Sequence, residues 1–346
     1  MNHHKKNLAT SVCLLLLFST QAQKIELLNS GSNFSIRGLS VVTDKIVWVS
    51  GTGGVVGKST DAGKTWQWMK VPGFEQRDFR DIEAFDAYTA IVLAIAEPGQ
   101  ILKTTDGGQN WKVVYSDTSK GIFLDAMDFA DEYNGVVIGD PLPGSMYIYR
   151  SYTRNGGNSW FRPADDNKHI LPVQEGEAMF ASSGSNVVFI KSDGFYSSNK
   201  MYIVTGGKAS NLLSQNPLQK KLLPLQQGKE STGANSIAIL NPNSLVIVGG
   251  DFSNDKDSTG NCVLSKDGGL SFSTPQTSPH GYRSCVEFLT KNKLVACGTS
   301  GVDISLDGGL NWTLLSTESF HVCRKAKKGQ SIYLAGTNGR VARLTW

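Results

Sequence analysis

Short apolar runs separated by polar turns are the dominant pattern along the chain. An apolar run that ends at Val42, for example, is followed by the turn Thr43-Asp44-Lys45 and by a second apolar run that starts at Ile46. Runs of this kind, bounded by Gly, Asp and Asn, are typical of β-strands joined by tight turns. The 37 glycines among the 346 residues fit many such turns. The pattern therefore predicts an all-β protein.

One turn recurs five times with the pattern Ser/Thr-x-Asp-x-Gly-x-x-aromatic, although Asn155 replaces the Asp in one copy and Phe272 the Trp in another. An Asp at this place can accept hydrogen bonds from backbone N–H groups of its own turn, and the Gly permits a left-handed backbone conformation. We expect each copy to be a structural staple between two strands. The copies occupy 59–66, 104–111, 153–160, 265–272 and 305–312.

The spacing of this turn predicts the architecture. Neighbouring copies lie about 40–50 residues apart, a period typical of one four-stranded propeller blade. The third and fourth copies are separated by about two periods, so one blade between them lacks the motif. We predict a seven-bladed β-propeller of antiparallel blades. The expected blades span 34–69, 79–115, 123–163, 177–214, 235–274, 282–315 and the residues from 320 onward.

The last blade predicts how the ring closes. Its third strand, 339–346, is the last apolar run, so the blade lacks a fourth strand of its own. The apolar run 24–28 has no partner in the first blade. Pairing of this run with the last blade would remove an exposed sheet edge. We therefore predict a single domain, 24–346, closed by its N-terminal strand.

The first 23 residues have the features of a secretory signal peptide. A basic start, 3–6, precedes an apolar stretch, 8–18, and a small-x-small cleavage site, Thr20-Gln21-Ala22. The apolar stretch is too short to cross a bilayer. We expect export to the periplasm or beyond after cleavage near Ala22, without a lipid anchor. No later segment is apolar enough for a membrane span.

Charge and cysteine content narrow the possible functions. The net charge of +4 includes lysines of the signal peptide, so it does not indicate nucleic-acid binding. Outside that peptide the cysteines have no metal-site spacing, and in the predicted strands they are expected to be buried thiols. The glycine-rich run 51–57 lacks the spacing and following helix of a dinucleotide loop. We expect no metal, no cofactor and a monomer. The four cysteines are Cys262, Cys285, Cys297 and Cys323.

Ionisable residues recur where a propeller would gather them. The innermost strands start at one mouth of the central channel, and the second strands return to that mouth. Opposed charges there could hold a polar ligand, and arginines could grip a carboxylate or phosphate; the alternative is that these charges only neutralise one another. The predicted ligand-binding residues are Arg37, Arg80, Asp81, Asp140, Asn235, Asp251 and Arg283, with Asp125, Glu177 and His321 at equivalent strand starts.

The repeated turn resembles the Asp-box (BNR) repeat of sialidase-like propellers, and the whole run resembles exported bacterial relatives of the photosystem II stability/assembly factor. The resemblance implies a non-enzymatic scaffold that uses an arginine patch to bind a protein partner. We therefore predict an exported, non-catalytic propeller that binds a protein or an anionic or sugar ligand at the channel mouth. The residues that carry the second resemblance are 34–39, 78–82, 104–111, 138–141 and 232–237.

A carbohydrate-active enzyme at the same mouth is the alternative. A sialidase-like hydrolase would use Arg37, Arg80 and Arg283 as an arginine triad, with Asp125 and Glu177 as its acid and base. The Phe/Tyr-Arg-Ile-Pro start of sialidases is absent, however, and no Tyr is clearly placed as the nucleophile. A polysaccharide lyase would need a His or Tyr base, and the sequence offers His321 for that role.

Overall fold

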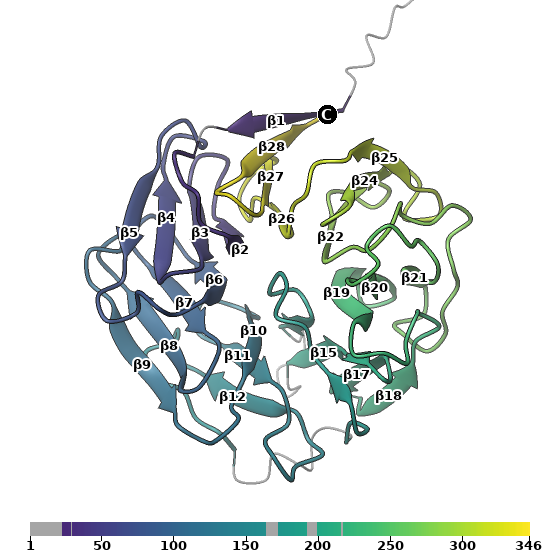
Figure 1. Ribbon diagram of the computed structural model, residues 1–346, viewed down its shortest axis with the longest axis horizontal. Coiled ribbons are helices and arrows are strands. Elements are labelled where there is room, and N and C mark those ends of the chain that lie inside the picture. Colours follow the sequence, from purple (N-terminus) through teal and green to yellow (C-terminus); the bar gives the residue numbers. More distant parts are fainter. Residues whose placement is uncertain (1–22, 29, 164–171, 192–198, 216) are drawn as a thin grey trace, which may run out of the picture.

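The computed structural model describes residues 23–28, 30–163, 172–191, 199–215 and 217–346. In this part of the chain the strands form seven antiparallel blades around a central axis (Figure 1), which confirms the predicted seven-bladed β-propeller. The predicted signal peptide lies outside the described residues except for its last position, so export stays a prediction. Within the described ranges, no helix has the length and apolar character that crossing a membrane would need.

Each blade is built mainly from strands that are consecutive in the sequence. Blade one contains β2 (Ile36–Val41), β3 (Val47–Gly51), β4 (Val55–Ser59) and β5 (Gln67–Lys70). Blade two contains β6 (Phe79–Ala84), β7 (Ala90–Ala94), β8 (Gly99–Thr104) and β9 (Lys112–Asp117). Blade three contains β10 (Leu124–Phe129), β11 (Gly135–Gly139) and β12 (Tyr149–Thr153). Blade four contains β14 (Val187–Ile190), β15 (Lys200–Val204), β17 (Asn211–Gln215) and β18 (Gln219–Leu222).

The remaining blades follow the same scheme. Blade five contains β19 (Thr232–Asn241), β20 (Ser244–Asp251) and β21 (Cys262–Ser265). Blade six contains β22 (Cys285–Phe288), β23 (Leu294–Gly298), β24 (Gly301–Ser305) and β25 (Thr313–Ser316). Blade seven contains β26 (Val322–Lys325), β27 (Ile332–Ala335), β28 (Val341–Thr345) and β1 (Lys24–Leu28). In blades three and five the fourth strand is reduced to a single bridge, formed by Phe161 and by Ser273 respectively.

Closure of the ring occurs as predicted. β1 pairs with β28 in antiparallel register from Lys24 opposite Thr345 to Leu28 opposite Val341, and the two strands lie side by side at the rim (Figure 1). Ile25 and Leu28 pack against the apolar cluster between the neighbouring blades. The first and last strands of the described residues therefore share one sheet, and β28 has no open edge.

The repeated turn forms the hydrogen bonds that its sequence predicts. Asp106 accepts a hydrogen bond from the Asn110 N–H at 3.0 Å, while the Thr104 hydroxyl accepts one from the Gly108 N–H at 3.0 Å. Gly108 has a φ of 91°, a conformation that disfavours any residue with a Cβ. The same two bonds occur in the other four copies, including the copy with Asn155. The turn is thus a local staple at the blade edge.

The start of blade four differs from the prediction. Glu177 does not begin an inner strand, because Glu177 and Ala178 form the short strand β13, which pairs with β16 (Gly206–Gly207) beside blade five. The inner strand of blade four is β14 instead. Residues 179–186, which we call the plug segment, precede β14 and project toward the centre of the ring as a teal loop (Figure 1).

The plug segment is held by several blades. The Ser183 hydroxyl donates to the carbonyl oxygen of Ser284 at 2.7 Å, and the Ser183 carbonyl accepts from Arg324 Nη2 at 2.8 Å. The Ser185 hydroxyl donates to Ser236 Oγ at 2.8 Å, and Gly184 lies against the carboxylate of Asp81. Blades two, five, six and seven therefore all contact this segment.

Candidate binding site at the channel mouth

Four inner strands carry a β-bulge at the same place near their start. The register between the first and second strands shifts at Arg37 in blade one, Arg80 in blade two, Asp125 in blade three and Asn235 in blade five. A bulge leaves one residue unpaired and re-aims its side chain. This local geometry explains why polar side chains at these positions gather at one mouth of the channel.

Arg37 and Arg80 form a pair of neighbouring cations at this mouth. Arg37 makes no hydrogen bond or ion pair with any residue that the structure describes, and burial together with the Arg80 guanidinium lowers its pKa. Arg80 has only long contacts, at 3.4 Å from Nη2 to Asp78 Oδ2 and at 3.5 Å from Nη1 to the Ala181 carbonyl oxygen. Asp78 also raises the pKa of Arg37 electrostatically, so this one carboxylate lies between two positive charges and compensates them only in part.

Polar atoms without partners surround the arginine pair. Arg80 Nε, His321 Nε2 and both carboxylate oxygens of Asp125 are buried and make no hydrogen bond in the described part of the chain. Burial and the nearby Asp140 raise the pKa of Asp125 against the opposing effect of Arg80, while burial and the two arginines lower the pKa of His321 to about 3. Buried polar groups are rarely left unsatisfied, so the mouth is suited to a bound polar ligand or to water.

Aromatic side chains form one wall of this mouth. Phe252 is 47% exposed and makes edge-to-face contacts with Phe180 at 5.6 Å and with Tyr282 at 6.3 Å between ring centroids. Tyr282 is also an electrostatic neighbour of Arg37. An exposed apolar surface beside the unpaired arginine could contact a peptide side chain next to an anionic group.

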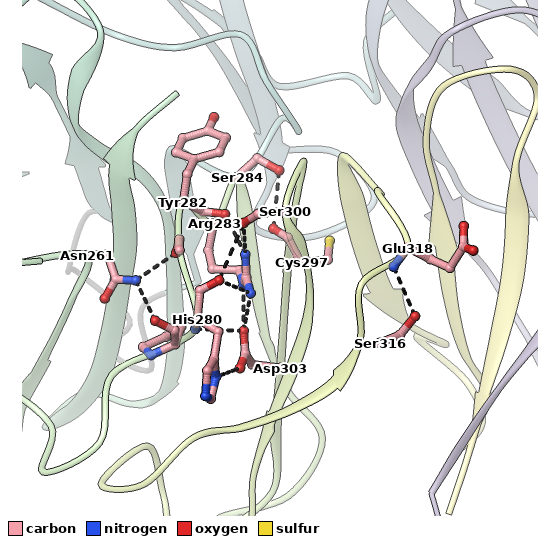
Figure 2. Close-up of polar contacts among 12 residues, drawn as sticks. Asn261, His280, Tyr282, Arg283, Ser284, Cys297, Ser300, Asp303, Ser316 and Glu318 are labelled. Atoms are coloured by element: carbon pink, nitrogen blue, oxygen red, sulfur yellow. Dashed lines mark hydrogen bonds and ion pairs between the residues drawn. The ribbon is translucent and has the colours of Figure 1, made fainter. Parts of the chain in front are cut away.

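Arg283 does not join the arginine pair, contrary to the prediction. It is fully buried within blade six, where its Nε donates to Asp303 Oδ2 at 2.7 Å and its Nη2 contacts the same carboxylate (Figure 2). Nη1 donates to Ser300 Oγ at 2.8 Å, and Asp303 also accepts from His280 Nδ1 at 2.6 Å. Because all its donors are engaged inside the protein, Arg283 has a structural role.

Glu177 is likewise placed away from the arginine pair. Its carboxylate accepts hydrogen bonds from the Thr205 hydroxyl at 2.6 Å, from Asn211 Nδ2 at 2.9 Å and from Lys220 Nζ at 2.9 Å. These partners precede or belong to the outer strands of blade four. Asp125, by contrast, accepts no hydrogen bond in the described residues. The structure does not present the two carboxylates as an acid and base pair.

The other predicted residues mainly stabilise the surroundings of the mouth. Asp81 accepts the Met127 N–H at 2.8 Å and so links blades two and three, and Asp140 accepts the Met179 N–H at 3.0 Å. Asn235 Oδ1 accepts from Tyr282 Oη at 2.8 Å and from the plug segment, and Asp251 accepts the Ser253 N–H at 2.9 Å. Burial raises the pKa of Asp81 to about 7.

Sequence reasoning missed two parts of this mouth. The plug segment was missed because its residues were assigned to an inner strand. Phe252 was also missed, although it follows directly after Asp251, where the second strand of blade five returns to the mouth. An aromatic residue directly after such a strand is a signal that could have identified it.

Comparisons with known proteins support the fold. The structure is similar to that of YCF48 bound to a D1 peptide, with a TM-score of 0.63, 14% identity and coverage of 95% of this chain and 98% of that chain. YCF48 from Cyanidioschyzon merolae gives a TM-score of 0.62 at 16% identity over 92% of this chain and 98% of that chain. The GH74 xyloglucanase from Xanthomonas campestris gives 0.62 at 10% identity, over 93% of this chain and 53% of the enzyme.

No protein-family model matches the sequence, and no curated protein matches it. At these identities the structural similarity shows a shared fold and leaves the activity open. The protein is thus a seven-bladed β-propeller whose structural neighbours include both a peptide-bound protein and a glycoside hydrolase.

Proposed function

We propose that this protein is an exported, non-catalytic propeller that binds a protein partner through an anionic group of that partner. The observation that carries the proposal is the arginine pair, in which Arg37 makes no hydrogen bond or ion pair in the described residues and Arg80 has only long contacts. Two adjacent guanidinium groups can grip a carboxylate through parallel N–H donors. A peptide carboxylate is the group that this arrangement fits best.

The energetic argument favours a ligand over a purely structural role. A partly buried charge without a hydrogen-bonded partner costs some free energy in the folded state, and two like charges side by side add to that cost. Burial and Arg80 lower the pKa of Arg37, which reflects this cost. An anion bound between the two arginines would compensate both charges. The neighbouring Phe252 offers apolar contact to residues that flank the anion.

The similarity to a propeller bound to a peptide supports a macromolecular partner. The carbohydrate-active alternative has weaker support, because Asp125 and Glu177 share no hydrogen-bond partner and Arg283 is occupied by Asp303. The protein therefore shares the fold of a GH74 enzyme, but Asp125 and Glu177 do not form a catalytic pair in the described residues.

Titration of the purified protein with matched peptides tests the proposal. A library of short acidic peptides with free C-terminal carboxylates is compared with the same peptides as C-terminal amides and with Asp and Glu replaced by Asn and Gln. We expect the wild type to bind members of the acidic library, and Arg37→Gln or Arg80→Gln to weaken that binding at least tenfold. The exposed Arg154→Gln is the control and should bind as the wild type does. Equal binding by the arginine variants would refute the proposal.

A further inference from the structure

A cavity of about 390 Å³ lies at the channel end opposite the arginine pair. Arg37 and Arg80 are near the starts of their inner strands, whereas this cavity is lined by later residues of inner strands, including Asp128, Ile239 and Glu287. The plug segment supplies Gly184 and Ser185 to its lining. Neither Arg37 nor Arg80 lines this cavity, so it is a separate candidate site.

Two carboxylates in this cavity lack a full set of partners. Glu287 accepts no hydrogen bond from any residue that the structure describes. Asp128 uses Oδ2 to accept the Phe189 N–H at 2.6 Å, and no described donor contacts its Oδ1. Burial raises the pKa of each carboxyl to about 7, and a neighbouring carboxylate adds to each shift, Glu83 at Asp128 and Asp128 at Glu287. The cavity therefore offers acceptors that the protein does not satisfy.

The cations that line this cavity, Arg324 and Lys325, lower the pKa of Glu287 electrostatically, but their hydrogen bonds go to other groups. Arg324 Nη1 donates to Cys285 Sγ and to the Cys323 carbonyl oxygen, both at 3.0 Å, and its Nη2 donates to the plug segment. Lys325 Nζ donates to the Leu289 carbonyl oxygen at 2.8 Å. Lys327, outside the cavity, is paired with Glu83 and donates to the Ala84 carbonyl oxygen at 2.9 Å. No described cation donates a hydrogen bond to Asp128 or Glu287, so these carboxylates can accept hydrogen bonds from an added cationic donor.

The remaining lining is largely aliphatic, with Val187, Ile237, Ile239 and Val286 among its residues. We propose that this cavity binds an aliphatic primary ammonium group, with the ammonium between Asp128 and Glu287 and the hydrocarbon part against these strands. No group of three or more possible metal ligands was found among the described residues, so an organic cation fits better than a metal ion. This inference is independent of the proposed partner at the arginine pair.

The ammonium group can come from a small amine or from a lysine side chain. Calorimetric titration with cadaverine and with Nα-acetyl-lysine amide distinguishes the two sources, and 1,5-pentanediol is the uncharged control. We expect one or both amines to bind at pH 8 and the diol not to bind. Glu287→Gln should weaken amine binding at least tenfold, whereas Glu132→Gln, in an exposed turn, should not. Binding of the diol as tightly as the amines, or unchanged binding by Glu287→Gln, would overturn the proposal.

A second measurement needs only the wild-type protein. A carboxyl with a pKa of about 7 is about 30-fold less ionised at pH 5.5 than at pH 8, so amine binding should weaken at least by that factor. At pH 7, binding should release up to about one proton, which titrations in buffers of different ionisation enthalpy measure. Amine binding without proton release and without this pH dependence, or no amine binding at millimolar concentration at pH 8, would also overturn it.

Discussion

Replacement of Asp303 by Asn tests whether Arg283 is structural. Asp303 is fully buried and accepts hydrogen bonds from Arg283 Nε at 2.7 Å, from the His280 backbone N–H at 3.1 Å and from His280 Nδ1 at 2.6 Å (Figure 2). The Asn side chain has nearly the same shape but no charge. It would leave the Arg283 guanidinium buried and uncompensated.

The expected loss is large because the pair is completely removed from water. Breaking a buried ion pair from one side costs about 3–5 kcal/mol. For a domain of this size, roughly 2 °C of melting temperature corresponds to 1 kcal/mol, so Asp303→Asn should melt roughly 6–10 °C below the wild type. The double variant Arg283→Met with Asp303→Leu removes both charges and should recover most of that loss.

Thermal and urea unfolding followed by circular dichroism measure these differences. The control is Glu318→Gln, which removes the partly exposed ion pair with Arg340 at 3.2 Å and should cost less than about 1 kcal/mol. If Asp303→Asn unfolds no more easily than this control, the buried pair is not structural. Loss of peptide binding in a fully stable Arg283→Met variant would instead place Arg283 in the binding site.

Three further predictions concern other parts of the ring. Deletion of 24–28 removes the strand that pairs with β28 and should lower the free energy of unfolding by about 2–5 kcal/mol; an unchanged melting point would contradict the observed closure. Asn235→Ala leaves the Tyr282 and Ser182 hydroxyls without their buried acceptor and should cost about 2–4 kcal/mol in urea unfolding, whereas a loss below about 0.5 kcal/mol would contradict this role. The raised pKa of Glu287, about 7, means that its ionisation is less favourable in the folded than in the unfolded protein. Wild-type stability relative to Glu287→Gln should therefore fall as the pH rises from about 4.5 to 7 and then level off, and a flat difference would refute the burial argument.

The fold could be predicted because its determinants are local and repeated. Each copy of the turn motif makes its hydrogen bonds within a few residues, as Asp106 does with Asn110, so the sequence alone defines the blade period. Closure could also be predicted, since the run 24–28 and the last strand each lacked a partner. The plug segment could not, because its contacts with Ser284, Ser236 and Arg324 join residues about 50–140 positions apart, and such contacts leave no local pattern.

Only part of the candidate site could be predicted, because some of its residues depend on contacts between distant parts of the sequence. Arg37 and Arg80 were identified correctly as residues near the starts of inner strands, and their bulges bring them to one mouth. Arg283 has a similar sequence context, but its partner Asp303 lies on the third strand of the same blade, so the sequence around Arg283 does not show that the charge is already paired. Glu177 was wrongly predicted to begin the inner strand of blade four, because its short strand β13 pairs with β16 in the sheet of blade five.

The contrast between Arg283 and the arginine pair is the strongest argument that the mouth has a function. Arg283 shows that this fold can bury an arginine with a complete set of hydrogen bonds and a carboxylate partner. Arg37 and Arg80, at bulges in adjacent blades, have no such set, although Asp125 occupies the corresponding bulge in the next blade. Burial and Asp140 raise the pKa of Asp125, which disfavours the ionised form that could compensate the two arginines. The folded protein thus retains a local concentration of positive charge that an anionic partner would stabilise, and that stabilisation would be measured as binding affinity.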